Sequence, residues 1–340
     1  MPRFTSLSPW LQARFGRSVF RVALDAGSTC PNRDGTKGVG GCVYCSVEGS
    51  GSGALRGGQE LAEQLERGIR RVCRRAPDPG VIAYFQSYSN TYVDPARLRE
   101  VLAVVEPHLG HPVVAVSVAT RPDTLGDEAL ALLSELGQRV PVWVELGLEA
   151  ADDRILRAIR RFHTVDDFRD AVARARRAGL EVVGHALLGL PGDGREGARR
   201  TARVLAETRV DGVKVHQLMV LRRTQLERTW RAGAVEVLSA EAYVSWLADF
   251  VERLRPEQVL HRLGGEAPGG ELLAPRWGLH KGALRELLAA ELTRRGTRQG
   301  SQRALEAPAS EEARGAAVRG GPLGAAVREG AESGRSSGTG

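Results

Sequence analysis

The sequence predicts an α/β fold, a partial (β/α)6 barrel with a C-terminal α/β extension. From Val19 onward, short runs of β-branched apolar residues alternate with longer helical patterns, as in a parallel sheet covered by helices. Six such units follow one another, so the barrel is an open version of the eight-unit barrel. At 340 residues the chain is long enough to bury one large core of this kind.

The apolar periodicity gives the expected positions of the elements. The expected strands are Val19–Leu24, Val81–Phe85, Val113–Ala119, Val142–Leu146, Glu181–Leu188 and Gly212–Leu218. The expected helices are Glu60–Arg75, Pro95–Glu106, Asp127–Leu136, Asp152–Ile159, Asp166–Ala178 and Arg195–Glu207. We then expect a helix at Glu241–Leu254, a strand at Val259–Leu263 and a helix at Lys281–Arg295, which could close the open edge of the barrel.

Four segments follow from this pattern. Residues 1–18 form an N-terminal segment, residues 19–222 the partial barrel and residues 223–300 the extension. From Ser301 the chain consists mainly of Ala, Gly, Ser, Arg and Glu with almost no large apolar residue. Such a segment cannot bury enough surface to offset its ordering entropy, so we expect a disordered tail over residues 301–340.

Charge and cysteine content narrow the function. The net charge is +7, and the tail carries five arginines and five glutamates, so the excess belongs to the folded body. That excess could bind a polyanion or form a solvated surface. Neither a signal-peptide apolar core nor a membrane-length apolar run is present. Four cysteines do not make a disulfide framework in a chain of this length, so we expect a cytoplasmic protein without membrane contact.

Three of the four cysteines lie within sixteen residues, CPNRDGTKGVGGCVYC, at the spacing C-x11-C-x2-C. A structural zinc site uses four ligands, usually as two pairs, and this stretch offers one pair and one single cysteine. Cys30, Cys42 and Cys45 instead suit an iron–sulfur cluster that keeps one iron open for chemistry. The glycines let the backbone wrap closely, and Tyr44 would place a ring beside the open iron, where an adenine could stack.

The position of the stretch supports this interpretation. It follows the first expected strand, so it occupies a βα loop at the carboxyl end of a barrel strand, where such sites lie. Cys73 falls in an Arg-rich helical pattern, where a lone cysteine is usually a small buried apolar residue. We therefore expect Cys73 not to bind the cluster.

Alternation along the strands predicts a polar barrel interior, because every second residue of a filled barrel faces the axis. On each of four strands the polar residues fall on the same side. The residues on that side are Tyr84 and Gln86 of the second strand, Trp143, Glu145, Gly147 and Glu149 of the fourth, His185 and Leu187 of the fifth, and Lys214 and His216 of the sixth. Buried charges are costly unless they are paired or bind a ligand. The interior therefore holds either a ligand or a structural ion pair between Glu145 and Lys214.

Lys214 and His216 are expected to contact the substrate, because the sixth strand lies across the open barrel from the cysteine loop. Lys214 is one of only three lysines in an arginine-rich chain. A lysine at this place offers a compact ammonium group that can pair with a carboxylate or phosphate or can lose its proton.

Eight ordered blocks of the sequence carry a resemblance to a known family. They are CPNRDGTKGVGGCVYC, YFQSYSNTY (84–92), ATRPD (119–123), VELGLEAADD (144–153), GHALLGLPGDG (184–194), DGVKVHQL (211–218), HRLGGEAP (261–268) and LLAPRW (272–277). Together they resemble a stand-alone family of bacterial radical S-adenosylmethionine (SAM) proteins, which are short relatives of the catalytic subunit of the elongator complex. The match runs from about Leu11 to Gly300.

The resemblance implies a TIM-like radical SAM barrel that uses a 4Fe-4S cluster and SAM. The implied cluster ligands are Cys30, Cys42 and Cys45, and the candidate SAM contacts besides Tyr44 are Gln86, Ser117, Glu145, Arg161 and the turn of Gly189, Pro191 and Gly192. In the implied reaction, a flavodoxin- or ferredoxin-type protein reduces the cluster by one electron, SAM is cleaved, and a 5′-deoxyadenosyl radical abstracts a substrate hydrogen. The family is associated with tRNA modification at the 5-substituent of the wobble uridine, which agrees with the basic body.

The chain departs from the family pattern at three places. The family usually has LGLQ where this chain has Glu149, NRGH where it has Arg160-Arg161-Phe162-His163, and LHVLKGT where it has residues 218–224, including Met219 and Arg223. The last departure removes a histidine and a lysine beside the expected substrate. Two other functions stay open: the same chemistry on a small metabolite, and a non-catalytic RNA-binding protein whose three cysteines hold zinc.

Overall fold

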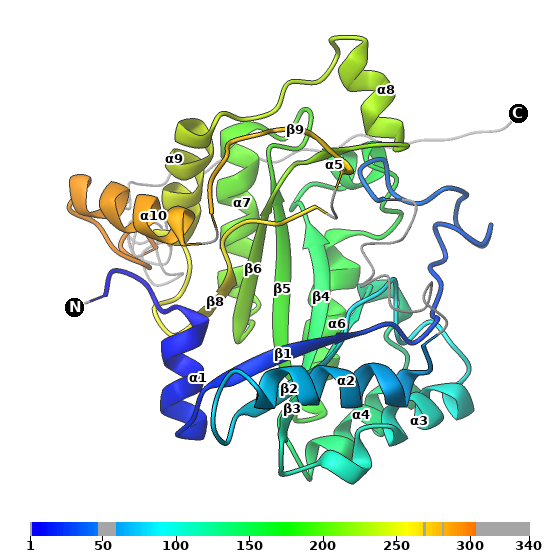
Figure 1. The fold of residues 1–340 in the computed structure, drawn as a ribbon. Helices are drawn as coiled ribbons and strands as arrows, with labels where there is room; N and C mark the ends of the chain where they lie inside the picture. The colour runs from blue at the N-terminus through cyan, green and yellow to red at the C-terminus, as the bar shows by residue number, and fades with distance from the viewer. Residues whose placement is uncertain (1, 47–58, 268–269, 281, 304–340) are drawn as a thin grey trace, which may run out of the picture. The chain divides into compact units, whose positions relative to one another are not determined.

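The computed structural model describes residues 2–46, 59–267, 270–280 and 282–303, which belong to one compact unit. Its centre is a sheet of seven parallel strands in the order β1-β2-β3-β4-β5-β6-β8. The strands are β1 (Val19–Leu24), β2 (Gly80–Phe85), β3 (Val113–Thr120), β4 (Val142–Glu149), β5 (Glu181–Leu188), β6 (Gly212–Gln217) and β8 (Val259–Arg262). Figure 1 shows the sheet curled into a half-barrel with helices on its outer face.

Helices connect consecutive strands, as parallel pairing requires. They are α2 (Leu61–Cys73), α3 (Pro95–Ala103), α4 (Asp127–Gly137), α5 (Asp153–Ala158), α6 (Val165–Arg177) and α7 (Gly194–Glu207), with short 3-10 turns at Glu106–His108 and Pro122–Thr124. Local sequence fixes where some of them begin. The Asp94 carboxylate accepts from the Ala96 N–H at 2.8 Å before α3, and Thr164 and Asp167 form a capping box at α6.

The two faces of the strands differ in chemistry, because successive side chains point to opposite sides. Toward the helices, residues such as Val144, Leu146 and Leu148 of β4 are buried in one large apolar core. Toward the interior of the half-barrel, β4 carries Trp143 near its amino end and Glu145 farther along. The interior is therefore apolar at the amino end of the sheet and polar at the carboxyl end.

Helix α1 (Leu7–Phe15) covers the amino end of the half-barrel interior. Its Leu11 is buried with Ile82, Ala115, Trp143 and Val183, which come from four adjacent strands. The rings of Trp10 and Trp143 lie 6.2 Å apart. The Leu260 N–H donates to the Thr5 carbonyl at 2.8 Å, which ties the segment before α1 to the edge strand β8. The N-terminal segment thus seals the end of the barrel opposite the polar one.

The extension contains α8 (Gln225–Arg231), α9 (Ala240–Val251), α10 (Ala283–Arg294) and an antiparallel pair, β7 (Val220–Leu221) with β9 (Leu272–Ala274). The predicted α/β half-barrel is confirmed, and the strand expected at Val259–Leu263 adds a seventh member by pairing with β6. Sequence did not predict α1, α8, β7 or β9, which are short. Lys281 and residues 304–340 lie outside the described residues, so the start of the last predicted helix and most of the predicted tail cannot be compared. Among the described residues, no helix is both long and apolar enough to cross a membrane.

Candidate active site

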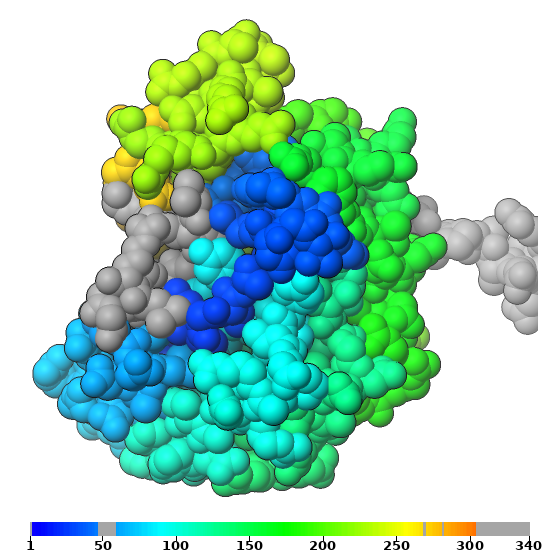
Figure 2. Space-filling view, turned by 90° about the vertical axis from the view of Figure 1, so that its right-hand side faces the viewer, coloured from blue at the N-terminus to red at the C-terminus, as the bar shows by residue number. Residues whose placement is uncertain are grey.

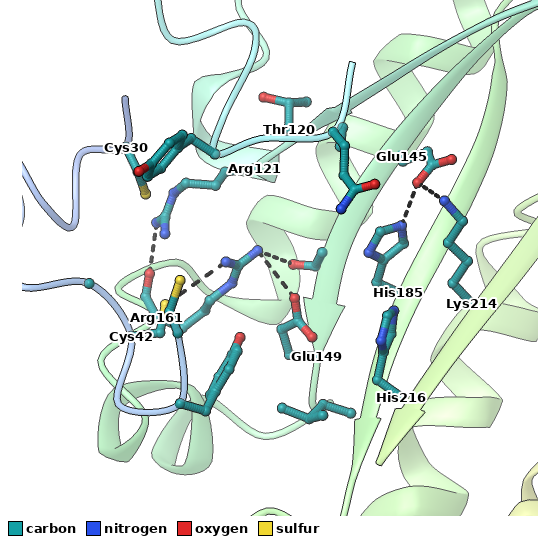
Figure 3. A pocket seen from close by; sticks show the side chains of 18 of the residues that line it. Cys30, Cys42, Thr120, Arg121, Glu145, Glu149, Arg161, His185, Lys214 and His216 are labelled. Carbon is teal, nitrogen blue, oxygen red and sulfur yellow. Dashed lines mark hydrogen bonds and ion pairs between the residues drawn. The ribbon is translucent and has the colours of Figure 1, made fainter. Parts of the chain in front are cut away.

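A cavity of about 220 Å³ lies at the carboxyl end of the sheet, bordered by the cysteine loop and by strands β2 to β6. Figure 3 shows its two sides. We call Cys30, Cys42, Cys45 and the loop that carries them the thiol wall. We call Glu145, His185, Lys214 and His216, from three adjacent strands, the charge wall. The barrel thus brings the predicted cluster ligands and the predicted substrate residues to one cavity.

The thiol wall is held by bonds from distant parts of the chain. The Asn32 amide donates to the Arg160 carbonyl at 2.7 Å, and the Val43 N–H donates to the Ile159 carbonyl at 3.1 Å. Lys37 bonds Asp123 after β3 with an N–O distance of 2.5 Å. The loop is therefore attached to two neighbouring connections of the barrel.

Donors surround two of the thiols. The Arg33 guanidinium lies 3.2 Å from the Cys45 sulfur, and the Asn32 amide lies 3.4 Å from the Cys42 sulfur. Burial raises the pKa of the Cys45 thiol, and Arg33 opposes that shift and so favours the thiolate form that binds iron. The Arg33 guanidinium also lies over the Tyr88 ring at 5.5 Å. Sequence reasoning missed Arg33, although its place inside the cysteine stretch was a signal.

The three thiols fit a cluster. Cys30, Cys42 and Cys45 are free and border one cavity. Among the described residues, no three His, Cys, Asp or Glu side chains meet as ligands of a single metal ion. A cluster differs from a single ion because each thiolate binds its own iron, so the thiols need only border the same space.

Cys73 lies outside this site, at the end of α2, and is exposed. The prediction that it is a buried apolar residue is wrong. Helix α2 buries Leu65, Gly68 and Val72, which form one stripe at helical spacing. Cys73 follows Val72 and is turned away from that stripe.

The charge wall centres on the Glu145 carboxylate, which has three partners. Lys214 forms a buried ion pair with Oε2, the His185 ring lies 2.9 Å from the same oxygen, and the Ser117 hydroxyl donates to Oε1 at 2.6 Å. The Lys214 ammonium also lies over the Tyr84 ring, 4.1 Å from its centre. The ion pair that sequence left open is therefore present, and it borders the cavity.

Burial and neighbouring charges shift the pKa values of this wall. Burial alone would raise the pKa of Glu145, but Lys214, His185 and Arg21 together hold that pKa well below its ordinary value. Burial lowers the pKa of Lys214 to about 7; Glu145 opposes the shift, and the cations Arg21 and Arg262 increase it. Glu145 stays ionised at neutral pH, while Lys214 exists in both protonation states.

Arg21 and Arg262 were not identified from the sequence. They lie on the two edge strands of the half-barrel, and the Arg21 guanidinium reaches the His261 carbonyl of β8 at 3.5 Å. For Arg21, the strand parity in the sequence could have predicted its position. Val22 and Leu24 of β1 are buried in the core beside the helices, so the intervening parity places Arg21 on the interior side.

Arg161 lies between the two walls. Its guanidinium donates to the Gly147 carbonyl at 3.0 Å, lies 3.5 Å from the Glu149 carboxylate and is 4.0 Å from the Cys42 sulfur. A side chain at Gly147 would collide with it, since a Cβ atom there would lie 2.2 Å from the guanidinium. Burial lowers the pKa of Arg161, but Tyr44 and Glu149 outweigh it and raise the pKa above its ordinary value.

Arg121 is buried and binds both Asp123 and the backbone of Arg161. It is 2% exposed, and two of its nitrogens bond Asp123 at 2.9 and 2.8 Å. Its Nη2 also donates to the Arg161 carbonyl at 2.7 Å, while Nη1 has no partner among the described residues. Burial opposes ionisation of Asp123, but Arg121 and Lys37 lower its pKa to about 2.

The remaining predicted cofactor residues divide into two groups. Tyr44, Gln86, Glu145 and Arg161 line the cavity, and Ser117 lies behind Glu145. Gly189, Pro191 and Gly192 do not line it. A Cβ atom at Gly189 would lie 3.2 Å from Leu238, and both glycines have positive φ angles, 90° and 78°. The two glycines allow the backbone conformation of the turn after β5.

Comparison with known proteins identifies the family. A model of the radical SAM superfamily matches residues 29–205, and one of the radical SAM C-terminal domain matches residues 210–294. The Bacillus subtilis protein YtqA is 37% identical over 88% of this chain and 92% of its own length. The Escherichia coli protein YhcC is 35% identical over 78% of this chain and 85% of its own.

More distant relatives share part of the chain. A tRNA uridine(34) acetyltransferase of Dehalococcoides mccartyi is 29% identical over 46% of this chain and 34% of its own length. Among solved structures, the N-terminally truncated Elp3 of Methanocaldococcus infernus superposes with a TM-score of 0.65 at 18% identity. That superposition covers 83% of this chain and 64% of Elp3, and it supports the fold.

Proposed function

This chain belongs to the radical SAM superfamily, and from its partial similarity to a tRNA uridine(34) acetyltransferase we propose that it modifies tRNA at the 5-substituent of the wobble uridine. It is an enzyme that uses a 4Fe-4S cluster and SAM. When bound, the reduced cluster and SAM supply a 5′-deoxyadenosyl radical that abstracts a hydrogen atom from the substrate. The residues of the cavity bind, orient and shield the reactants.

The proposed roles follow the two walls. Cys30, Cys42 and Cys45 hold the cluster, and Tyr44, Gln86, Glu145 and Arg161 hold SAM, with Ser117 orienting Glu145. Lys214 and His216 contact the substrate. The turn of Gly189, Pro191 and Gly192, after β5, is a further proposed SAM contact, although these residues do not line the cavity.

One observation carries the proposal: a small cavity has three thiols on one side and, on the other, the charge wall, whose side chains can exchange protons. A cavity of about 220 Å³ is too small to hold a folded RNA, so an RNA substrate must present a single group to it. Enzymes that act on a base turn it out of the stack into such a pocket. The net charge of +7 provides attraction for the RNA backbone.

Lys214 is suited to proton exchange with a substrate. Its amine lies against an ionised carboxylate and has a pKa of about 7, so it can donate or accept a proton near neutral pH. Glu145 and Tyr84 hold the amine in place. The tRNA assignment draws its direction from the relatives named for uridine(34), which match about half of this chain.

Two measurements test the proposal. Nucleosides from a strain that lacks the gene should show a changed wobble uridine, and the purified protein should restore the missing form on that tRNA with SAM and a reductant under anaerobic conditions. The same reaction should release 5′-deoxyadenosine. Unchanged wobble uridines, with 5′-deoxyadenosine released only in the presence of a small-molecule extract, would favour a metabolite substrate instead.

A further inference from the structure

A second cavity, of about 670 Å³, lies against the cysteine loop. It shares Arg33, Gly41, Cys42 and Cys45 with the first cavity. These shared residues form a wall between the two spaces. The other side of the second cavity comes from Arg160, from α8 and from the two residues before it, namely Arg223, Thr224, Gln225, Arg228 and Thr229. In Figure 2 the α8 region, in yellow-green, lies above the blue cysteine segment.

The second cavity is basic. Four arginines line it, Arg33, Arg160, Arg223 and Arg228, and its described lining contains no Asp or Glu. The Arg223 side chain is 67% exposed and lies 3.9 Å from Glu271, and Arg228 is exposed. The Arg223 backbone N–H also donates to the Glu227 carboxylate at 2.6 Å, but two acids beside exposed side chains neutralise only part of the charge of four arginines. The rim therefore presents a positive field to solvent.

The residue that precedes Gly40 of the cavity lining has an exposed apolar side chain. Val39, in the cysteine loop beside Gly40 of the cavity lining, is 68% exposed, the highest value among the large apolar residues that the structure describes. An apolar contact within a ring of charges is typical of a surface that binds another protein. A surface that served only to bind phosphates would not need it.

We propose that this basic rim, with Val39, is the docking surface for an acidic one-electron carrier protein that reduces the cluster. The carrier gives up one electron and the cluster gains it, and no bond forms or breaks. The observations favour a protein over RNA, because the RNA must reach the first cavity with its reacting base, whereas an electron donor must approach the thiols. The second cavity borders Cys42 and Cys45 directly. The proposal rests on the cluster, and only the preference for a protein over RNA rests on the proposed function.

The test measures reduction of the cluster-loaded protein without substrate, so its result does not depend on tRNA. Reduced flavodoxin, an acidic flavoprotein, is mixed with the protein anaerobically, and the cluster absorbance is followed. The double variant Arg223→Glu/Arg228→Glu should lower the second-order rate constant by at least about tenfold at low salt. The neutral variant Arg223→Gln/Arg228→Gln should give an intermediate loss, and raising the salt should shrink both differences.

Two controls make the result specific. Photoreduced deazaflavin, a small donor, should reduce all variants at one rate. The variant Arg67→Glu/Arg71→Glu, on the exposed face of α2, changes the net charge equally and should keep the original flavodoxin rate. Equal flavodoxin rates for the Arg223/Arg228 variants and the unchanged protein would overturn the proposal. A loss of tRNA affinity without a loss of flavodoxin rate would also overturn it and would assign the rim to RNA.

Discussion

The two walls of the cavity are built in different ways. The charge wall comes from adjacent strands, where His185 pairs in register with Lys214 on β6 and with Gly147 on β4. The thiol wall comes from one loop, which is attached to the barrel by bonds such as that from Asn32 to Arg160. The sheet thus fixes the first wall, whereas side-chain and loop contacts fix the second.

This difference predicts different consequences of mutation. Removing a group from the charge wall disturbs a buried ion pair inside the barrel, so it affects both stability and turnover. Removing a group from the thiol wall should affect the cluster and leave the fold largely intact, because none of the three cysteines belongs to the large apolar core. Variants that separate folding from cofactor binding test whether the walls are independent.

The largest expected effect is loss of the cluster. Replacing Cys30, Cys42 or Cys45 by Ala should abolish iron binding after anaerobic reconstitution, since three thiolates are the minimum set here. Circular dichroism of these variants should match that of the apoprotein. Cys73→Ala is the matched control and should bind the full amount of iron. A comparable loss of iron in Cys73→Ala would refute the three-ligand assignment.

The next effect concerns the charge wall. Lys214→Ala should keep the cluster but eliminate modification of the substrate, and it should lower the free energy of unfolding by about 3 kcal/mol because Glu145 is left buried without its cation. Urea unfolding and nucleoside analysis measure the two losses. Cluster loss in this variant would show that the walls are not independent.

A double variant separates stability from chemistry at the same place. Glu145→Leu/Lys214→Met replaces the ion pair by apolar groups of similar size, so it should recover most of the lost stability. It should still fail to modify the substrate. Recovered turnover in the double variant would mean that the pair serves the fold alone.

The two walls were also predictable to different degrees. Cysteine spacing placed Cys30, Cys42 and Cys45 together, and strand parity placed Glu145 and Lys214 in the interior. Parity works because a strand has a fixed period of two residues. No comparable rule describes a loop, so the contact between Arg33 and the Cys45 sulfur was not found.

The same reasoning explains the fold-level misses. Long helices and buried strands were placed within a few residues, because their apolar periodicity is sustained. Helix α1 buries only Leu11 of its nine residues, so its sequence has no clear apolar stripe. The turn at Gly189 and Gly192 was assigned to the cofactor because glycine permits close approach; both glycines have positive φ angles, and their contact with the cofactor stays a prediction.

A fourth prediction concerns Arg161, which lies between the two walls. Gly147→Ala should displace Arg161, because the new Cβ atom would lie 2.2 Å from its guanidinium. We expect SAM affinity to fall by about tenfold, equivalent to about 1.4 kcal/mol, with the cluster retained. Equilibrium dialysis with SAM measures this. Gly126→Ala is the control, since a Cβ atom there meets nothing within 4 Å and its φ is −77°.

The last prediction tests the attachment of the thiol wall to the barrel. Asp123 bonds both Lys37 of the cysteine loop and the buried Arg121, and its pKa is about 2 instead of 3.8. A carboxyl group whose pKa is lowered by folding stabilises the folded state above its unfolded pKa, and this contribution is lost as the pH falls through the folded pKa. Asp123→Asn should therefore cost about 2 kcal/mol at pH 7.

The difference between Asp123→Asn and the unchanged apoprotein should be constant above a pH of about 5 and should shrink as the pH falls from 3.8 toward 2. Urea unfolding across this range measures it. Asp127→Asn, at a side chain that is 92% exposed, should show a difference below about 0.5 kcal/mol at every pH. A difference for Asp123→Asn that does not vary with pH would mean that the carboxylate charge does not hold the loop, and that packing alone joins the thiol wall to the barrel.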